Sequence, residues 1–126
     1  MCLLRSSPPR QGLSMAVVDV HSHYVPGGWP DLAAACGGTD WPSLRVDSPT
    51  QATIMLGDRV FRPITDACWN ADTRLADMDA DDVAVQVVSP TPVFFAYDKP
   101  AAAAATVARL LDRKSTRLNS SHIPLS

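Results

Sequence analysis

The stretch VVDVHSHYVP (residues 17–26) places two histidines, His21 and His23, directly after a short run of apolar, mostly β-branched residues. Such a run is typical of a β-strand that is buried on both faces. The Pro- and Gly-containing segment that follows predicts a loop at the carboxyl end of this strand. Because ligand sites of parallel α/β folds lie at that end of their strands, the two histidines stand where a site is expected.

The surrounding sequence predicts alternating strands and helices. A second buried strand is indicated by VAVQVVSPTP (residues 83–92), and two β-prone runs flank Gly57, where a two-residue hairpin turn with positive φ is expected. Asn70 is a candidate N-cap for a helix, and Pro100 suits the first turn of another. Two buried strands that alternate with helices favour a βαβ unit with a parallel sheet, and therefore the α/β class.

Composition limits the classes of partner. The chain has 126 residues, 46% of them hydrophobic, and a formal net charge of -2. This charge gives no reason to expect a nucleic acid or an anionic membrane as a partner. No apolar run reaches the length of a membrane span. The three cysteines form no CxxC motif and favour reduced thiols, so we expect a cytoplasmic protein.

The two ends of the chain look unlike its middle. Residues 1–14 are a polar, Pro-containing leader that we expect to lie outside the fold, and Met15 offers an alternative start to Met1. Residues 15–111 carry the expected fold. Residues 112–126 lack periodicity, and most of this segment can be encoded by a common sequencing-library adapter. We therefore expect it to be an artefactual, disordered tail; a natural polar tail is the alternative.

The spacing of the two histidines suits metal binding. Residues i and i+2 of a strand point to the same side, so both imidazoles can reach one ion, and Asp19 is expected on the same face. Neutral imidazole is a good ligand for Zn²⁺ and also for Fe, Ni or Co. An H-x-H pattern alone is a weak signal, however, and an ordinary polar junction between strand and loop explains it as well.

A resemblance adds to this pattern. The segment VDVHSH resembles the apolar-D-x-H-x-H motif on the first strand of the amidohydrolase superfamily, whose members are metal-dependent (β/α)8 barrels. The match extends over about residues 16–111 and is most similar to the branch that decarboxylates carboxymuconate semialdehydes. The segments that carry it are F-R-P-I (residues 61–64), C-W (residues 68–69), the R-x-x-x-M-D helix (residues 74–79) and the V-Q-x-x-S-x-x-P-V strand exit (residues 85–93).

The resemblance implies a fold and a set of site residues. The chain would be the N-terminal part of a (β/α)8 TIM barrel, with about two of the eight strands and a β-hairpin insertion after the first. His21 and His23 would be zinc ligands, although another divalent transition metal is an alternative. Arg62 would bind a substrate carboxylate through its planar fork, and Asp19 would orient a ligand. Without the resemblance, Arg62 reads as a surface arginine and Asp19 as an ordinary polar residue of the barrel mouth.

The function implied for the full-length protein is decarboxylation of a carboxymuconate semialdehyde in tryptophan catabolism through kynurenine. Its substrate would be a small carboxylate, and the resemblance also implies a homodimer. The remaining metal ligands and the catalytic acid or base would come from later strands, so no catalytic residue is assigned here and the chain itself is expected to be inactive. Alternatives are a metal-dependent lactone or amide hydrolase of the same superfamily and a small non-enzymatic metal-binding module.

Two further groups of side chains are candidates for contact or packing. Phe94, Phe95 and Tyr97 directly follow the second strand, and one of them is a candidate for substrate contact. Cys36 and Cys68 have no base beside them in the sequence, so we expect both to pack in the interior.

Overall fold

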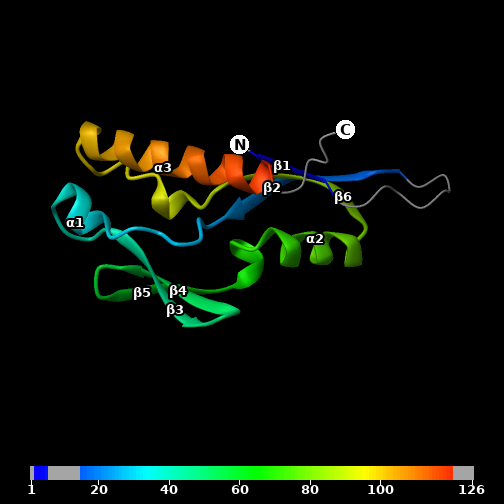
Figure 1. Cartoon of the computed structure of the whole chain (residues 1–126), viewed down its shortest axis with the longest axis horizontal. Coiled ribbons are helices and arrows are strands. Elements are labelled where there is room, and N and C mark those ends of the chain that lie inside the picture. Colours follow the sequence, from blue (N-terminus) through cyan, green and yellow to red (C-terminus); the bar gives the residue numbers. More distant parts are fainter. Residues whose placement is uncertain (1, 6–14, 121–126) are drawn as a thin grey trace.

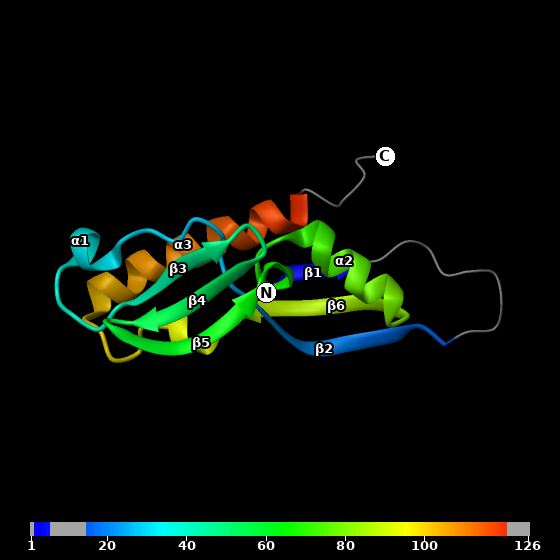
Figure 2. The ribbon, with the colours of Figure 1, turned by 90° about the horizontal axis from the view of Figure 1, so that it is seen from below.

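The computed structural model describes residues 2–5 and 15–120, which form a mixed α/β arrangement with two three-stranded sheets (Figures 1 and 2). The strands are β1 (Cys2–Arg5), β2 (Val17–Tyr24), β3 (Pro42–Ser48), β4 (Gln51–Leu56), β5 (Arg59–Thr65) and β6 (Val83–Pro90). The helices are α1 (Leu32–Cys36), α2 (Ala71–Ala80) and α3 (Ala101–Ser120), and the short 3₁₀ segments are η1 (Asp66–Cys68) and η2 (Pro92–Phe94).

The first sheet contains the two strands that the sequence predicts as a buried pair, but the prediction that β2 is buried on both faces is wrong. Val17, Val18 and Val20 are 51%, 50% and 74% exposed, because the described residues cover this strand incompletely. The order of this sheet is β1-β6-β2, and β2 runs parallel to β6, with Val18 beside Val85 and His23 beside Ser89. The α2 helix lies between these strands in the chain, and Asn70 caps it by accepting hydrogen bonds from two backbone N–H groups. The predicted α/β class with a parallel strand pair is therefore confirmed. The described residues form no closed barrel, so the barrel itself stays a prediction.

The second sheet is an antiparallel meander in the order β3-β4-β5. The predicted hairpin is confirmed, because Leu56 pairs with Arg59 across a two-residue turn in which Gly57 has a φ of 56°. We did not predict β3, where only Leu44 and Val46 alternate with polar residues. The meander lies beyond the carboxyl end of β2 (Figure 2), which is the end that carries the histidines.

The start of the chain differs from our expectation. We expected residues 1–14 to lie outside the fold, but residues 2–5 form β1 and pair antiparallel with β6. Leu4 is 1% exposed and packs with Tyr24, Met78 and Val88. This pairing satisfies backbone N–H and C=O groups that an open edge of β6 would leave without strand partners. Residues 6–14 lie outside the described part of the chain.

Replacing Leu4 with alanine tests whether β1 belongs to the fold. Removal of a buried leucine side chain is expected to lower the free energy of unfolding by about 2–5 kcal/mol. The matched control is Leu3→Ala, because Leu3 lies on the same strand but is 45% exposed and should cost much less. Urea denaturation of both variants measures the difference. Equal, small losses in the two variants would contradict a structural role for β1.

The end of the chain also differs from our expectation. α3 follows Pro100 as predicted, but it continues past Leu111 to Ser120, so residues 112–120 are helical and not a disordered tail. Arginine, lysine and leucine in this segment are good helix formers, and no glycine or proline interrupts it. The adapter origin of the segment stays a prediction, and His122 lies outside the described residues. Within the described part of the chain, no helix is both long and apolar enough to cross a membrane.

Two clusters of buried side chains hold the elements together. One joins α2 to a face of the first sheet through Met78, Val88 and Tyr24. The other fills the space between the meander, α1, η2 and α3; its buried members are Val25, Leu32, Trp41, Ile54, Phe94, Ala96, Val107 and Leu111. The Tyr24 hydroxyl links the two by donating a 2.9 Å hydrogen bond to the Leu111 carbonyl. The loop at the carboxyl end of β2 is thereby packed between both clusters.

Candidate functional site

The two histidines lie next to each other near the carboxyl end of β2. Their ring centroids are 5.0 Å apart and the ring planes are nearly perpendicular, at 81°. His21 is exposed and His23 is partly buried. His23 Nδ1 lies 3.1 Å from the Ser89 hydroxyl on β6. The expectation that the two imidazoles point to the same side therefore agrees with the geometry, and the contact with Ser89 leaves Nε2 of His23 available for a metal ion.

A β-bulge interrupts β2 at the histidines. Asp19 pairs with Gln86 and Ser22 pairs with Val88, so Val20 and His21 stand opposite the single residue Val87 of β6. A bulge of this kind shifts the side-chain alternation of its strand by one residue. Across the bulge, residues i and i+2 therefore no longer point to the same face of the sheet.

The bulge moves Asp19 away from the face that we expected. Its carboxylate is hydrogen-bonded to Gln86, whereas His23 is beside Ser89, and residues 86 and 89 point to opposite faces of β6. Asp19 therefore shares the α2 side of the sheet with Gln86, and His23 lies on the other side. The prediction that Asp19 shares a face with the histidines is wrong, because it assumed a regular strand.

Asp19 is nevertheless connected to the site through the backbone. Its Oδ1 accepts a 3.0 Å hydrogen bond from the His21 N–H, and its Oδ2 accepts a 2.8 Å bond from the Gln86 side-chain amide. The His21 N–H, and to a lesser degree the Gln86 amide, hold the pKa of Asp19 below its usual value. Asp19 therefore stays ionised at neutral pH and holds the bulge from the α2 side. Its role toward a metal ligand stays a prediction.

The donor set can be compared with what a transition metal needs. Two adjacent imidazoles suit Zn²⁺ and its neighbours in the periodic table, but a catalytic zinc site normally has three protein ligands and one open position. Among the described residues, no group of three or more His, Cys, Asp or Glu side chains is placed to hold an ion. His21 and His23 thus fit part of a metal site, and this part of the chain does not complete it.

Arg62 lies on β5, in the second sheet, opposite Ile54 of β4. Its side chain is exposed, and within the described residues its guanidinium has no hydrogen-bond or ion-pair partner. No hydrogen bond or ion pair joins it to His21 or His23 in this part of the chain. Its donors are therefore free for a ligand, and its proposed role in substrate binding stays a prediction.

A cleft of about 370 Å³ lies beside the segment that follows β6, and Phe95, Tyr97 and Lys99 contribute to its lining. Phe94 is different, because it is 0% exposed and packs edge-on against Trp29 at 4.6 Å. Among the three aromatic residues that we considered for substrate contact, Phe95 and Tyr97 are accessible from the cleft and Phe94 belongs to the core.

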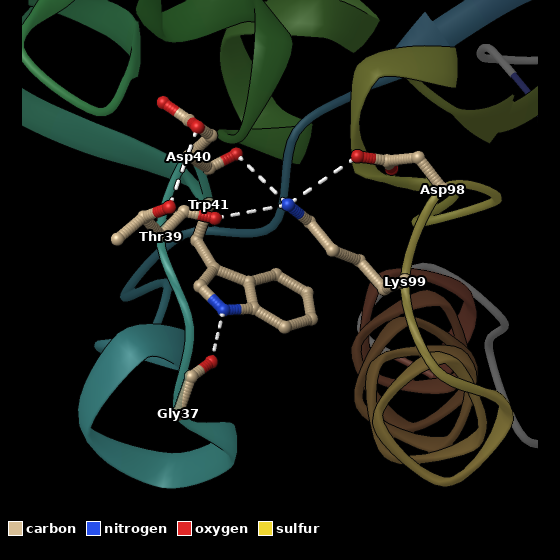
Figure 3. A network of polar contacts seen from close by, with 6 residues as sticks. All are labelled: Gly37, Thr39, Asp40, Trp41, Asp98 and Lys99. Carbon is tan, nitrogen blue, oxygen red and sulfur yellow. Dashed lines mark hydrogen bonds and ion pairs between the residues drawn. The ribbon is translucent and has the colours of Figure 1, made fainter.

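Lys99 connects two chain segments beside this cleft (Figure 3). Its ammonium group donates hydrogen bonds to the backbone carbonyls of Thr39 and Asp40, at 3.0 and 3.5 Å, and pairs with Asp98 at 3.3 Å. It also lies 5.0 Å from the centroid of the Trp41 ring. These contacts tie the segment before α3 to the segment before β3, so the cleft has a fixed wall.

Sequence reasoning missed three residues that surround the histidines. Arg74 donates to the Ser22 hydroxyl and to Gln86, and Ser89 contacts His23. Arg74 lies in the predicted helix that follows Asn70, and Gln86 and Ser89 lie in the predicted strand of residues 83–92, but the sequence assigned none of the three to the site. A polar glutamine within the apolar run VAVQVV was the available local signal.

The cysteine side chains agree with a packing role. Cys36 and Cys68 are both partly buried, and both pack against the larger cluster. Burial raises the pKa of the Cys68 thiol, which disfavours the thiolate needed for nucleophilic chemistry.

Comparison with known proteins supplies a relationship that this geometry alone does not. No protein-family model matches the chain. A protein from Dictyostelium discoideum named 2-amino-3-carboxymuconate-6-semialdehyde decarboxylase is 38% identical over 80 residues, or 64% of this chain and 22% of that protein. The chain resembles this decarboxylase. Proteins of the same name from Caenorhabditis elegans (34% identical over 97 residues, 75% of this chain and 24% of that protein) and Sus scrofa (36% over 47 residues, 37% and 34%) also match.

These matches confirm the resemblance to a decarboxylase of the amidohydrolase superfamily. The matched part of the chain spans about a quarter of the length of two of these relatives and about a third of the other. The likeness therefore concerns one portion of such an enzyme, and the activity of the whole protein is a separate question.

Proposed function

We propose that the full-length protein is a metal-dependent decarboxylase of 2-amino-3-carboxymuconate 6-semialdehyde. The observation that carries this proposal is the side-by-side arrangement of His21 and His23 near the carboxyl end of β2, in a chain that resembles decarboxylases of that name. His21 and His23 would hold a zinc ion as two of its ligands. The ion would supply Lewis-acid activation of the substrate.

The first sheet supports the further proposal that the full-length protein is a TIM barrel. The face that carries His23 also carries Val18 and Leu3, which pair with Val85 and Val87, and these two side chains are 50% and 45% exposed. The α2 helix covers the opposite face (Figure 1). In a (β/α)8 barrel the helices lie outside and apolar side chains fill the interior, so an uncovered apolar face opposite a helix is what a piece of such a barrel would present.

The proposed reaction breaks the bond between the substrate and a carboxylate that leaves as carbon dioxide. The electron pair left behind enters the conjugated semialdehyde, and a proton then replaces the lost carboxylate. Arg62 would hold a substrate carboxylate, because its planar fork forms two parallel hydrogen bonds with such a group. The proton donor and the remaining metal ligands would come from parts of the protein outside this chain.

An assay of the full-length protein tests this proposal. The protein should release carbon dioxide from 2-amino-3-carboxymuconate 6-semialdehyde and should lose this activity when a chelator removes the metal. A full-length protein that leaves this substrate unchanged but hydrolyses lactones or amides would instead support the hydrolase alternative, which shares the two histidines.

Replacing Arg62 with methionine in the full-length protein is expected to raise KM for the semialdehyde by about 10- to 100-fold, because a charged hydrogen bond to a carboxylate contributes about 1.5–3 kcal/mol. Steady-state kinetics measure the change. The matched control is Arg109→Met, because Arg109 is exposed on α3 and does not line the cleft. An unchanged KM in the Arg62 variant, or an equal rise in both variants, would contradict the assignment of Arg62.

A further inference from the structure

We propose that Arg74 is a positioning residue for the two histidines, which holds the bulged end of β2 from the α2 side. This inference rests on the proposed metal-binding role of His21 and His23. Arg74 makes no hydrogen bond to either imidazole ring. It would act by fixing the backbone that carries both rings.

Arg74 lies in the first turns of α2 and is only 9% exposed. Its Nε donates to the Ala67 carbonyl at 3.0 Å. Its Nη1 donates to the Ser22 hydroxyl at 2.8 Å and to the Gln86 side-chain carbonyl at 2.9 Å, and its Nη2 donates to the His23 carbonyl at 2.7 Å. All three nitrogens of the guanidinium therefore donate hydrogen bonds. Three of the four acceptors belong to β2, which carries the histidines, or to its neighbour β6.

These hydrogen bonds connect Arg74 to the backbone of both histidines, directly for His23 and through two other side chains for His21. The His23 carbonyl accepts directly from Arg74. His21 is reached indirectly, because Gln86 accepts from Arg74 and donates to Asp19, and Asp19 in turn accepts from the His21 N–H. The strand is bulged between Asp19 and Ser22, directly before His23, and lacks a regular ladder there. Side-chain hydrogen bonds therefore replace the ladder in fixing how the two residues are oriented.

The chemistry of arginine suits this role better than that of any other cation. The guanidinium is a rigid planar fork that can donate in several directions at once, whereas a lysine ammonium is a single point at the end of a flexible chain. Burial lowers the pKa of Arg74, but an arginine remains charged at neutral pH. With carbonyl, amide and hydroxyl oxygens around it, each nitrogen of this buried charge has at least one hydrogen-bond partner.

The alternative is that Arg74 only stabilises the fold. The packing of α2 allows this structural role to be distinguished from a positioning role. α2 is already attached to the sheet by Met78, which packs with Leu4, Tyr24 and Val88 without Arg74. Loss of the guanidinium should therefore leave the helix on the sheet while the end of β2 loses its fixed orientation. A positioning role predicts a local change at the histidines, and a structural role predicts a loss of stability without one.

The test uses the 126-residue chain with Arg74→Lys, and Arg109→Lys on the exposed side of α3 as the matched control. NMR spectra of the imidazole groups in the metal-free chain should show changed signals for both His21 and His23 in the Arg74 variant and unchanged signals in the control. Titration with Zn²⁺ should show an affinity lowered by about 10- to 100-fold, the range typical of groups that orient metal ligands. Circular dichroism and urea denaturation establish that each variant is folded.

A folded Arg74→Lys chain with wild-type imidazole signals would overturn the inference. If that variant does not fold, Gln86→Met is tested instead. This substitution removes the hydrogen bonds that connect Arg74 to Asp19 and His21, and it leaves Arg74 its other three acceptors. It should change the His21 signals more than those of His23, and a chain in which neither changes would overturn the inference. If the wild-type chain binds no Zn²⁺, the proposed metal site fails, while the imidazole signals still decide whether Arg74 positions the histidines.

Discussion

Alanine at His23, or at His21, is expected to abolish Zn²⁺ binding by the 126-residue chain. The wild-type chain should bind the ion weakly, because two imidazoles supply fewer ligands than a zinc site normally has. Removal of either one leaves a single imidazole beside the bulge, which cannot chelate. Competition with a chromophoric chelator measures the affinity, and the imidazole NMR signals identify the nitrogen atoms that bind.

His122→Ala is the matched control, since it removes the third histidine of the chain from a segment outside the described residues. We expect this variant to bind Zn²⁺ as the wild-type chain does. Binding that survives the loss of both His21 and His23 would contradict the assigned site. A tight, stoichiometric site whose occupation drives cooperative folding would instead favour a complete metal-binding module over a piece of an enzyme.

Alanine at Phe94 is expected to lower the free energy of unfolding by about 3–5 kcal/mol, the usual cost of removing a fully buried phenylalanine. Phe94 is 0% exposed, and its ring meets that of Trp29 in the cluster that joins the meander to α1 and α3. Because small domains are stable by only about 5–15 kcal/mol, this loss should remove a large share of the free energy of unfolding. Urea denaturation followed by circular dichroism measures it.

Tyr97→Ala is the control for this substitution. Tyr97 lies three residues further along the same segment but is 89% exposed, so its loss should change stability by no more than about 0.5 kcal/mol. A large loss of stability at Tyr97, or a small one at Phe94, would contradict the packing of η2 described above. The same variant also shows whether the cleft beside Lys99 matters for substrate binding in the full-length protein.

Features governed by neighbouring residues were predictable from the sequence. Gly57 allows the positive φ of a two-residue turn, Asn70 offers a side-chain oxygen to the first N–H groups of a helix, and the β-branched runs indicate the two strands β2 and β6, which pair in parallel. The two histidines were predictable as neighbours because they lie only two residues apart on one strand. For the turn, the helix cap and the histidines the decisive interactions lie within a few residues along the chain, whereas the pairing of β2 with β6 joins residues more than sixty positions apart.

Other features depended on residues far apart in the sequence. The pairing of β1 with β6 joins residues 2–5 to residues 85–88, and no local pattern in the polar leader indicates it. Residues 112–120 continue α3 because they contain good helix formers and no glycine or proline, although their polar composition predicts a disordered tail. Each end of the chain thus belongs to an element that depends on residues in the middle.

The sequence by itself determined that two imidazoles stand together at the carboxyl end of a parallel strand, because periodicity and turn residues act locally. Only the tertiary structure decided which groups surround them. The bulge after Asp19 depends on how β2 lies against β6. Asp19 lies on the α2 side, where it accepts from Gln86, which in turn accepts from Arg74. Such a bulge needs one extra residue opposite a partner strand that lies more than sixty residues away, and strand register of this kind is set by packing across the sheet.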